Sequence, residues 1–319
     1  MKAAVYRENG GPEVLSYEEV ADPVPGADEV LIRVEAISIE GGDLLSRQRL
    51  PLPHSPYIVG YSTAGTVIAV GEHVTDLRVG QRVSAFGETG SHAELRVVRP
   101  DHCWVLPDGL DAAAAACVPV AFGTAYEALF EQAAVTTGST VLVQGVAGGV
   151  GFAAVQLAAK AGARVIGTGS SRRQLDALRR LGLHDGIDYT TEDVRRRVLD
   201  LTDGVGVDLV VDPVGGPMTQ ELILATREGG TIAFLGFSAG QPLIDPVTLV
   251  MGDRTMKGFM LSKIFHTPRV RAYLTDIFRR VADGDLDVLV DRTFPLADAA
   301  DAHRYAEQRG RLGRVVMTP

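Results

Sequence analysis

A glycine-rich segment near the middle of the chain constrains its fold more than any other feature. Residues 140–143 are a short apolar run typical of a buried parallel strand, and residues 152–161 have the pattern of a helix that ends at Gly162. Four glycines stand between them, within residues 145–151. Such a turn lets backbone N–H groups approach a pyrophosphate, and the positive end of the following helix faces the anion. The segment therefore predicts a nucleotide-binding turn.

The glycine spacing departs from the usual dinucleotide fingerprint. The pattern is Gly145-x-x-Gly148-x-x-Gly151, with Val146 where a glycine of G-x-G-x-x-G would fall. A tightly packed strand-to-helix turn in any α/β domain would show similar glycines, so the neighbouring segments must decide between these alternatives.

Length, composition and charge limit the other possibilities. A chain of 319 residues, 46% of them hydrophobic, suits two domains with sizeable cores. The net charge of −9 argues against a nucleic-acid partner, because no basic stripe could meet a phosphate backbone. No apolar segment looks long enough to cross a bilayer, and residues 1–7 begin no apolar leader, so we expect a cytoplasmic protein without a membrane partner. Two cysteines, Cys103 and Cys117, cannot form a four-cysteine zinc site.

The first hundred residues differ in pattern from the rest. Short valine-rich runs bounded by Gly and Pro predict a mainly antiparallel, barrel-like domain without a helix of useful length; the runs are residues 30–37, 65–70, 82–86 and 92–98. Helices are predicted over 112–117 and 122–134, with a domain boundary near Pro119.

Alternating strands and helices surround the glycine turn. Further strands are predicted at 164–168, 186–189, 207–212, 230–236 and 256–261, and helices at 174–181, 192–201 with Thr191 as N-cap, 218–225 and 269–282. This order is typical of a doubly wound parallel sheet. The tail, with strands at 292–294 and 313–317 around a helix at 297–307, is predicted to rejoin the first domain. We therefore expect an α/β protein with a β-rich substrate domain, residues 1–118 and 263–319, and a nucleotide domain, residues 119–262.

The residues after the second strand of this sheet bear on the cofactor. A carboxylate there would accept from the ribose of NAD, whereas this chain has Ser170, Ser171, Arg172 and Arg173. Arginine binds phosphate through paired charge-assisted hydrogen bonds, so the sequence favours NADPH with its 2′-phosphate at these residues. The alternative is that a serine caps the next helix and the arginines form a solvated first turn, although cations there oppose the helix dipole.

Short motifs spread along nearly the whole chain carry a family resemblance. The matching segments are residues 1–5, 10–15, 56–60, 64–67, 70–71, 79–83, 123–126, 141–151, 212–216 and 313–316. Their order and spacing resemble those of the quinone oxidoreductase (zeta-crystallin-like) family of zinc-independent medium-chain dehydrogenases/reductases. The resemblance implies a GroES-like first domain, a Rossmann second domain and a homodimer joined edge to edge through the last strand, at about residues 256–261.

The resemblance also implies roles for single residues. Gly148, Gly149, Val150 and Gly151 match the pyrophosphate turn. The other matches to positions around the cofactor are Thr124 beside the nicotinamide ribose, Tyr189 near the adenosine phosphate, Val214 and Gly215 after the fourth strand, Phe237 and Ser238 after the fifth strand, and Arg314 as a basic residue near the end of the chain. For Arg314, an exposed surface arginine is the alternative.

Both zinc sites of the metal-dependent relatives are missing from the motifs. Glu40 stands at the position of a ligating cysteine and Tyr61 at that of a histidine. Glu40 also replaces the asparagine usual in quinone reductases. Its carboxylate could stabilise the oxidised nicotinamide, donate a proton if burial raises its pKa, point to solvent or pair with an arginine. Asp43 and Arg47 could form a pair that pins the same loop.

These features predict an NADPH-dependent, metal-free reductase that transfers hydride to a quinone or to the β-carbon of an α,β-unsaturated carbonyl. Tyr61 is the candidate donor to the developing enolate oxygen, and Glu40 is the candidate acid or orienting group. Two alternatives remain open. One is a biosynthetic enzyme of the same fold that uses Glu40 for non-redox proton transfer, and the other is a non-catalytic NADPH-binding protein.

Overall fold

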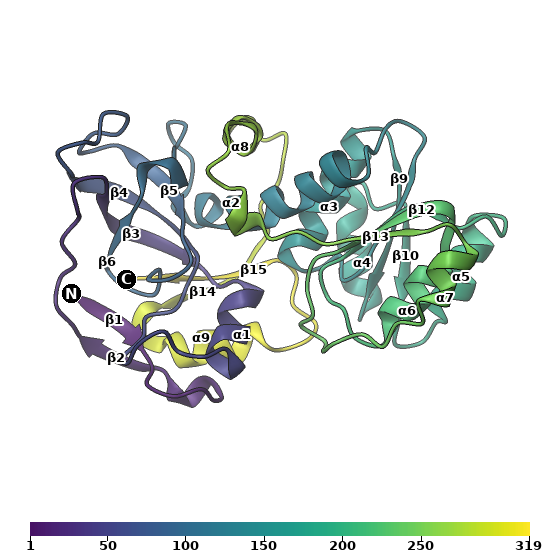
Figure 1. Ribbon diagram of the computed structural model, residues 1–319, viewed down its shortest axis with the longest axis horizontal. Coiled ribbons are helices and arrows are strands. Elements are labelled where there is room, and N and C mark those ends of the chain that lie inside the picture. The colour runs from purple at the N-terminus through teal and green to yellow at the C-terminus, as the bar shows by residue number, and fades with distance from the viewer. The chain divides into compact units, whose positions relative to one another are not determined.

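Two units of different architecture make up the chain, for which a computed structural model describes residues 1–319 (Figure 1). Unit 1 consists of Met1–Val120, Leu261–Gln308 and Arg314–Pro319, and unit 2 of Ala121–Met260 and Arg309–Gly313. Residues 309–313 lie in the tail assigned to the first domain from the sequence, yet they pack with unit 2. Their backbone is held there by Gly313, whose N–H donates to Ala147 O over 2.8 Å.

A seven-stranded sheet forms the centre of unit 1. Its strands run in the order β14-β15-β3-β4-β5-β7, with β6 also paired to β3. The bounds are β3 Val30–Ser38, β4 Ser62–Val70, β5 Arg82–Phe86, β6 Leu95–Val98, β7 Cys103–Val105, β14 Val290–Pro295 and β15 Arg314–Thr318. All neighbours are antiparallel except β14 and β15. The C-terminal tail contributes β15 to this sheet, where β15 pairs with β3.

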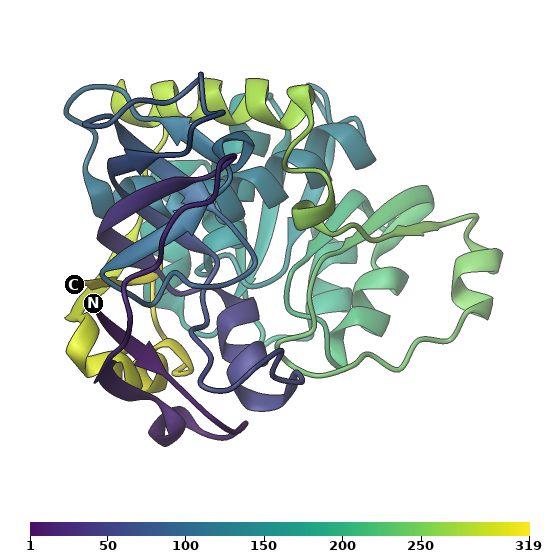
Figure 2. The same ribbon diagram turned by 60° about the vertical axis from the view of Figure 1, so that its left-hand side comes forward.

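Helices and a hairpin cover this sheet. The helices are α1 Gly41–Arg49, α8 Pro268–Ala282 and α9 Ala299–Ala306. The hairpin of β1 (Lys2–Val5) and β2 (Ser16–Glu19) lies beside α9 in both ribbon views (Figure 2). The expectation of no useful helix in the first hundred residues was wrong at α1. Its buried face carries Asp43 and Arg47, so the sequence lacks the apolar stripe that signals an amphipathic helix.

One continuous helix, α2 (Ala112–Tyr126), replaces the two helices predicted around Pro119 and runs on into a π-helical turn, Glu127–Gln132. Proline has no N–H to donate to the carbonyl four residues earlier. That carbonyl, Ala115 O, accepts instead from Ser84 Oγ at 2.9 Å. By length and composition alone, Ala112–Gln132 could cross a membrane, whereas no such segment was expected from the sequence. However, 67% of the most apolar window of this helix is buried inside the protein. It is therefore the core helix of a folded protein.

Unit 2 contains a six-stranded parallel sheet in the order β10-β9-β8-β11-β12-β13. The strands are β8 Thr140–Val143, β9 Arg164–Gly169, β10 Asp185–Asp188, β11 Val207–Asp212, β12 Thr226–Phe234 and β13 Thr255–Lys257. The helices are α3 Gly149–Lys160, α4 Arg172–Leu178, α5 Val194–Leu201, α6 Met218–Leu224 and α7 Val247–Met251. The strand order reverses between β8 and β11, which is where open sheets of this kind bind ligands.

Two local predictions in unit 2 need correction. The N-cap of α5 is Asp193, whose side chain accepts from Arg196 N, and not Thr191. The last strand is shorter than the predicted 256–261, because β13 pairs with β12 only over Thr255–Lys257.

Candidate functional site

The glycine turn after β8 combines tight packing with an open helix end. Gly145 has φ +66°, and a Cβ on Gly151 would lie 2.3 Å from Gly145 O, so both glycines are needed for packing. Gly148, the exposed N-cap of α3, is different, because its nearest neighbour would be 3.5 Å from a Cβ. The first intrahelical bond runs from Phe152 N to Gly148 O. The N–H groups of residues 149–151 therefore remain available to an anion.

Both serines after β9 serve the start of α4. Ser171 is its N-cap and accepts from Gln174 N at 3.3 Å, while Ser170 Oγ donates to Gln174 Oε1 at 3.2 Å. The capping role considered from the sequence is thus present. Two arginines occupy the first turn of α4: Arg172 contacts Glu192, and Arg173 is exposed without an ion-pair partner.

Asp212, at the end of β11, organises the loop that carries Val214. Its buried carboxylate accepts from the N–H groups of Val214 and Gly215 at 3.0 and 2.7 Å, and Thr219 Oγ1 donates to it at 2.7 Å. Burial raises the pKa of Asp212, and these hydrogen bonds oppose the shift. Sequence reasoning gave Asp212 no role, although an acidic residue followed by two glycines at a strand end was the available signal.

The loop after β12 packs against the Asp212 loop. Ala239 N donates to Val214 O at 2.9 Å, and a Cβ on Gly215 would lie 2.8 Å from Gly236 O. The predicted positions Val214, Phe237 and Ser238 therefore lie on neighbouring loops of unit 2. Tyr189 also lies at this edge of the sheet, since its N–H donates to Gly169 O, and Thr124 is a partly exposed residue of α2.

Glu40, in unit 1, forms a buried ion pair. It is the N-cap of α1 and only 3% exposed. Its Oε1 accepts from Ser38 Oγ at 2.8 Å, and its Oε2 lies 2.6 Å from Arg314 Nη2. Arg314 also donates to Ile39 O. Burial raises the pKa of Glu40, while Arg314 and Ser38 oppose the shift. Among the roles considered for Glu40 from the sequence, this geometry corresponds to an ion pair with an arginine.

Asp43 and Arg47 do not pair with each other, so that expectation was wrong. Asp43 Oδ2 accepts from Glu40 N at 2.7 Å, and Asp43 Oδ1 is buried without a partner. Burial raises the pKa of Asp43 to about 8. The fully buried Arg47 instead contacts Glu307 and lies 3.2 Å from His303 Nδ1.

Tyr61 lies across the first turn of α1. A Cβ on Gly42 would be 2.3 Å from Tyr61 Cε2, so only glycine admits the ring there. The ring is also tilted against Phe86, with centroids 6.0 Å apart. Burial raises the pKa of Tyr61 to about 12, and a hydrogen bond with Ser46 opposes the shift. Its phenol therefore keeps its proton at neutral pH and can donate a hydrogen bond.

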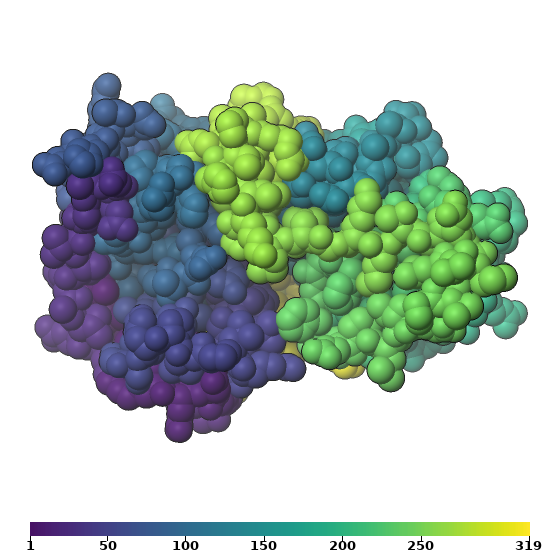
Figure 3. All heavy atoms as spheres, viewed as in Figure 1, coloured from purple at the N-terminus to yellow at the C-terminus, as the bar shows by residue number.

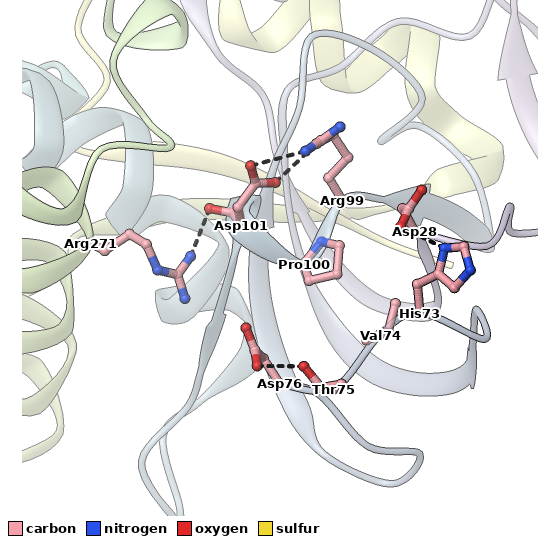
Figure 4. Close-up of a pocket in the computed structure, with 9 residues that line it drawn as sticks. All are labelled: Asp28, His73, Val74, Thr75, Asp76, Arg99, Pro100, Asp101 and Arg271. Carbon is pink, nitrogen blue, oxygen red and sulfur yellow. Dashed lines mark hydrogen bonds and ion pairs between the residues drawn. The ribbon is translucent and has the colours of Figure 1, made fainter.

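A surface pocket of about 400 Å³ lies elsewhere in unit 1 (Figure 4). Several of its polar groups already have partners, because Arg99 contacts the Asp101 carboxylate and Arg271 donates to Asp101 O. It is lined by Asp28, His73, Val74, Thr75, Asp76, Arg99, Pro100, Asp101 and Arg271, none of them a predicted site residue.

Known proteins resemble the chain over its whole length. Residues 26–118 match the family described as the alcohol dehydrogenase GroES-like domain, and residues 149–278 match the zinc-binding dehydrogenase family. The quinone oxidoreductase of Pseudomonas aeruginosa is 35% identical over 320 residues, which cover 97% of each chain. This chain belongs to the quinone oxidoreductase family. The 2-haloacrylate reductase of Burkholderia sp is 32% identical over 330 residues, or 99% of this chain and 98% of the relative.

The fold of this quinone oxidoreductase family member agrees with the comparisons. The crystal structure of Escherichia coli quinone oxidoreductase complexed with NADPH matches it with a TM-score of 0.96 at 26% identity, covering 100% of both chains. The predicted GroES-like domain and Rossmann sheet are therefore confirmed.

The residues of this family member do not fit a zinc ion, although one matching family is described by that metal. No three His, Cys, Asp or Glu side chains are grouped closely enough to hold a metal ion. Glu40, at the position of a ligating cysteine, is held by Arg314, and Tyr61 occupies the histidine position. Cys103 and Cys117 are free and buried.

Proposed function

We propose that this protein is an NADPH-dependent reductase that transfers hydride to a quinone or to the β-carbon of an α,β-unsaturated carbonyl compound. The observation that carries the proposal is the open N-terminus of α3 behind the glycine turn, beside the two arginines that begin α4. The names of the relatives, a quinone oxidoreductase and a 2-haloacrylate reductase, and the NADPH complex of the Escherichia coli enzyme support it.

The residues of unit 2 fit NADPH. The N–H groups of Gly149, Val150 and Gly151 would hold the pyrophosphate, and Gly148 leaves room for its approach. Arg172 and Arg173 would meet the 2′-phosphate. The remaining assignments are Tyr189 to the adenosine half, and Thr124, Val214, Phe237 and Ser238 to the nicotinamide half. When bound, NADPH supplies the hydride.

For unit 1 we propose that the phenol of Tyr61 donates a hydrogen bond to the substrate oxygen that gains negative charge during reduction. Its raised pKa keeps the donor protonated at neutral pH. We assign positioning roles to Glu40 and Arg314. The charges of the two side chains compensate each other, and the ion pair fixes the start of α1. This pair gives no support to a non-redox proton transfer by Glu40, or to a direct cofactor contact by Arg314.

We also propose a homodimer of cytoplasmic location, joined through the β13 edges. β13 pairs only with β12, so its other edge is open. Apolar side chains that precede and follow β13 in the chain are exposed: Leu243, Val247, Val250, Met251 and Met260. Figure 3 shows part of the surface of unit 2 in green. Such a patch marks an interaction site. A dimer by analytical ultracentrifugation that dissociates in Val250→Asp would agree, whereas a monomeric wild type would refute it.

The function is tested by following cofactor oxidation with a panel of quinones, enones and enoyl thioesters. We expect turnover with NADPH, a lower KM for NADPH than for NADH, and a loss of about tenfold or more in kcat for Tyr61→Phe. Tyr57→Phe, a change in a buried tyrosine of unit 1, is the matched control. Tight NADPH binding without turnover on the whole panel would favour a non-catalytic protein, and turnover without cofactor oxidation would favour proton transfer.

A further inference from the structure

Arg172 is held by a carboxylate that the proposed function does not use. Its Nη2 lies 2.8 Å from Glu192 Oε1, and its Nη1 donates to Gly186 O at 3.1 Å. Glu192 is itself fixed, because Asp188 N donates to Oε1 at 2.9 Å. Arg197 Nε lies 3.7 Å from its Oε2. The carboxylate is therefore tied into the β10–α5 connection by contacts to both of its oxygens.

This carboxylate stands at the proposed 2′-phosphate position. Arg172 is the first residue of α4, three residues after the end of β9, where the adenosine ribose of a dinucleotide meets such a sheet. Tyr189, assigned to the adenosine half, follows β10 and precedes Glu192 by three residues. Arg173, by contrast, is exposed and has no ion-pair partner.

The two arginines therefore differ in what they offer to a phosphate dianion. The charge of Arg172 is compensated by Glu192, and a phosphate bound to the other face of its guanidinium would still be repelled by that carboxylate. The charge of Arg173 is uncompensated. Because the pair is partly exposed, solvent and salt reduce the repulsion to the range of a surface charge interaction.

We propose that Glu192 is a specificity-determining residue of the cofactor site. It holds Arg172 and weakens the recognition of the NADPH 2′-phosphate, which leaves most of that recognition to Arg173. This inference rests on the proposed function.

The test measures binding without turnover, by titration calorimetry of NADP⁺ and NAD⁺ into the full-length protein. Glu192→Gln removes the charge and keeps an oxygen to accept from Asp188 N. Asp176→Asn is the matched control, since it removes an exposed carboxylate of α4 that pairs with Arg179, the residue after that helix. Arg172→Ala and the double variant complete a cycle, and thermal unfolding shows that each variant is folded.

Glu192→Gln should bind NADP⁺ about two- to fivefold more tightly and leave NAD⁺ unchanged, with no gain in the Arg172→Ala background. Weaker NADP⁺ binding would overturn the proposal, since the carboxylate would then orient Arg172 for phosphate. An equal change for both nucleotides would also overturn it. If the wild type shows no preference for NADP⁺, the NADPH assignment itself fails, and that result is visible before any variant is made.

Discussion

Glu40 and Arg314, near opposite ends of the chain, form an ion pair with 2.6 Å between Oε2 and Nη2 and both side chains largely buried. The pair joins the start of α1 to β15, the strand that brings the tail back to the first sheet. A charge buried in this way is costly without its partner. The pair therefore explains both the position of α1 and why Glu40 cannot act as a solvated carboxylate.

Breaking this pair from one side should destabilise unit 1 strongly. Arg314→Met leaves an uncompensated buried carboxylate, so we expect the free energy of unfolding at pH 7 to fall by about 3 kcal/mol or more. Adding Glu40→Gln should restore part of the loss. Urea denaturation measures both, and Arg279→Met, at an exposed pair on α8, should change little. Equal losses in the single and double variants would contradict the coupling.

Ionisation of the buried Asp43 should lower the free energy of unfolding as the pH rises. Burial raises its pKa to about 8 in the folded protein, whereas an unfolded chain has a value near 3.9. The native state thus binds the extra proton, and its contribution to stability, complete below about pH 4, is lost as the pH rises through about 8.

Asp43→Asn isolates this effect, because the amide keeps an acceptor for Glu40 N and does not ionise. We expect the unfolding free energy of the variant, relative to wild type, to increase from pH 5 to pH 8 and then to level off. Denaturant melts across that range provide the measurement. A difference that stays constant with pH would show that Asp43 does not titrate there.

Two buried histidines should impose the opposite dependence at acid pH. Arg47 can only donate, so His303 Nδ1 accepts from it, and His303 Nε2–H then donates to His92 Nε2 at 2.8 Å. His92 Nδ1–H is left to donate to Ser91 Oγ at 3.0 Å. Both rings are therefore neutral. Burial lowers the pKa of His92 to about 3, and it also lowers the pKa of His303 well below its usual value.

The contribution of these neutral rings to the free energy of unfolding is complete above about pH 6.5. It is lost as the pH falls toward their folded pKa values, because the unfolded chain then binds the protons. We expect the unfolding free energy to drop by about 1.4 kcal/mol per pH unit for each neutral histidine below pH 6. His92→Gln should reduce that slope, and His54→Gln, at an exposed residue, should not. A slope unaffected by His92→Gln would count against the network.

Substitutions at two glycines of the turn, Gly151 and Gly148, should have different effects, the first mainly on stability and the second mainly on cofactor binding. Gly151→Ala places a methyl group 2.3 Å from Gly145 O, so we expect a loss of about 1–3 kcal/mol in stability. Gly148→Ala meets no atom closer than 3.5 Å and should cost about 1 kcal/mol or less. It should nevertheless weaken NADPH binding, measured by fluorescence titration, because the methyl group would stand where we propose that the pyrophosphate approaches. Wild-type affinity in Gly148→Ala would place the anion elsewhere.

The sequence by itself determined the parallel sheet, the glycine turn and the arginines after β9. These features rest on local periodicity and on residue types at fixed spacing, which need no knowledge of distant contacts. Only the tertiary structure decided the rest. Helix α1 was missed because its buried face is charged, and α2 continues past Pro119 because Ser84 supplies the absent donor. Glu40 became a buried partner of Arg314, and Arg172 a partner of Glu192. The state of a charged side chain depends on desolvation and on partners that the fold brings from far along the chain, and no local pattern contains them.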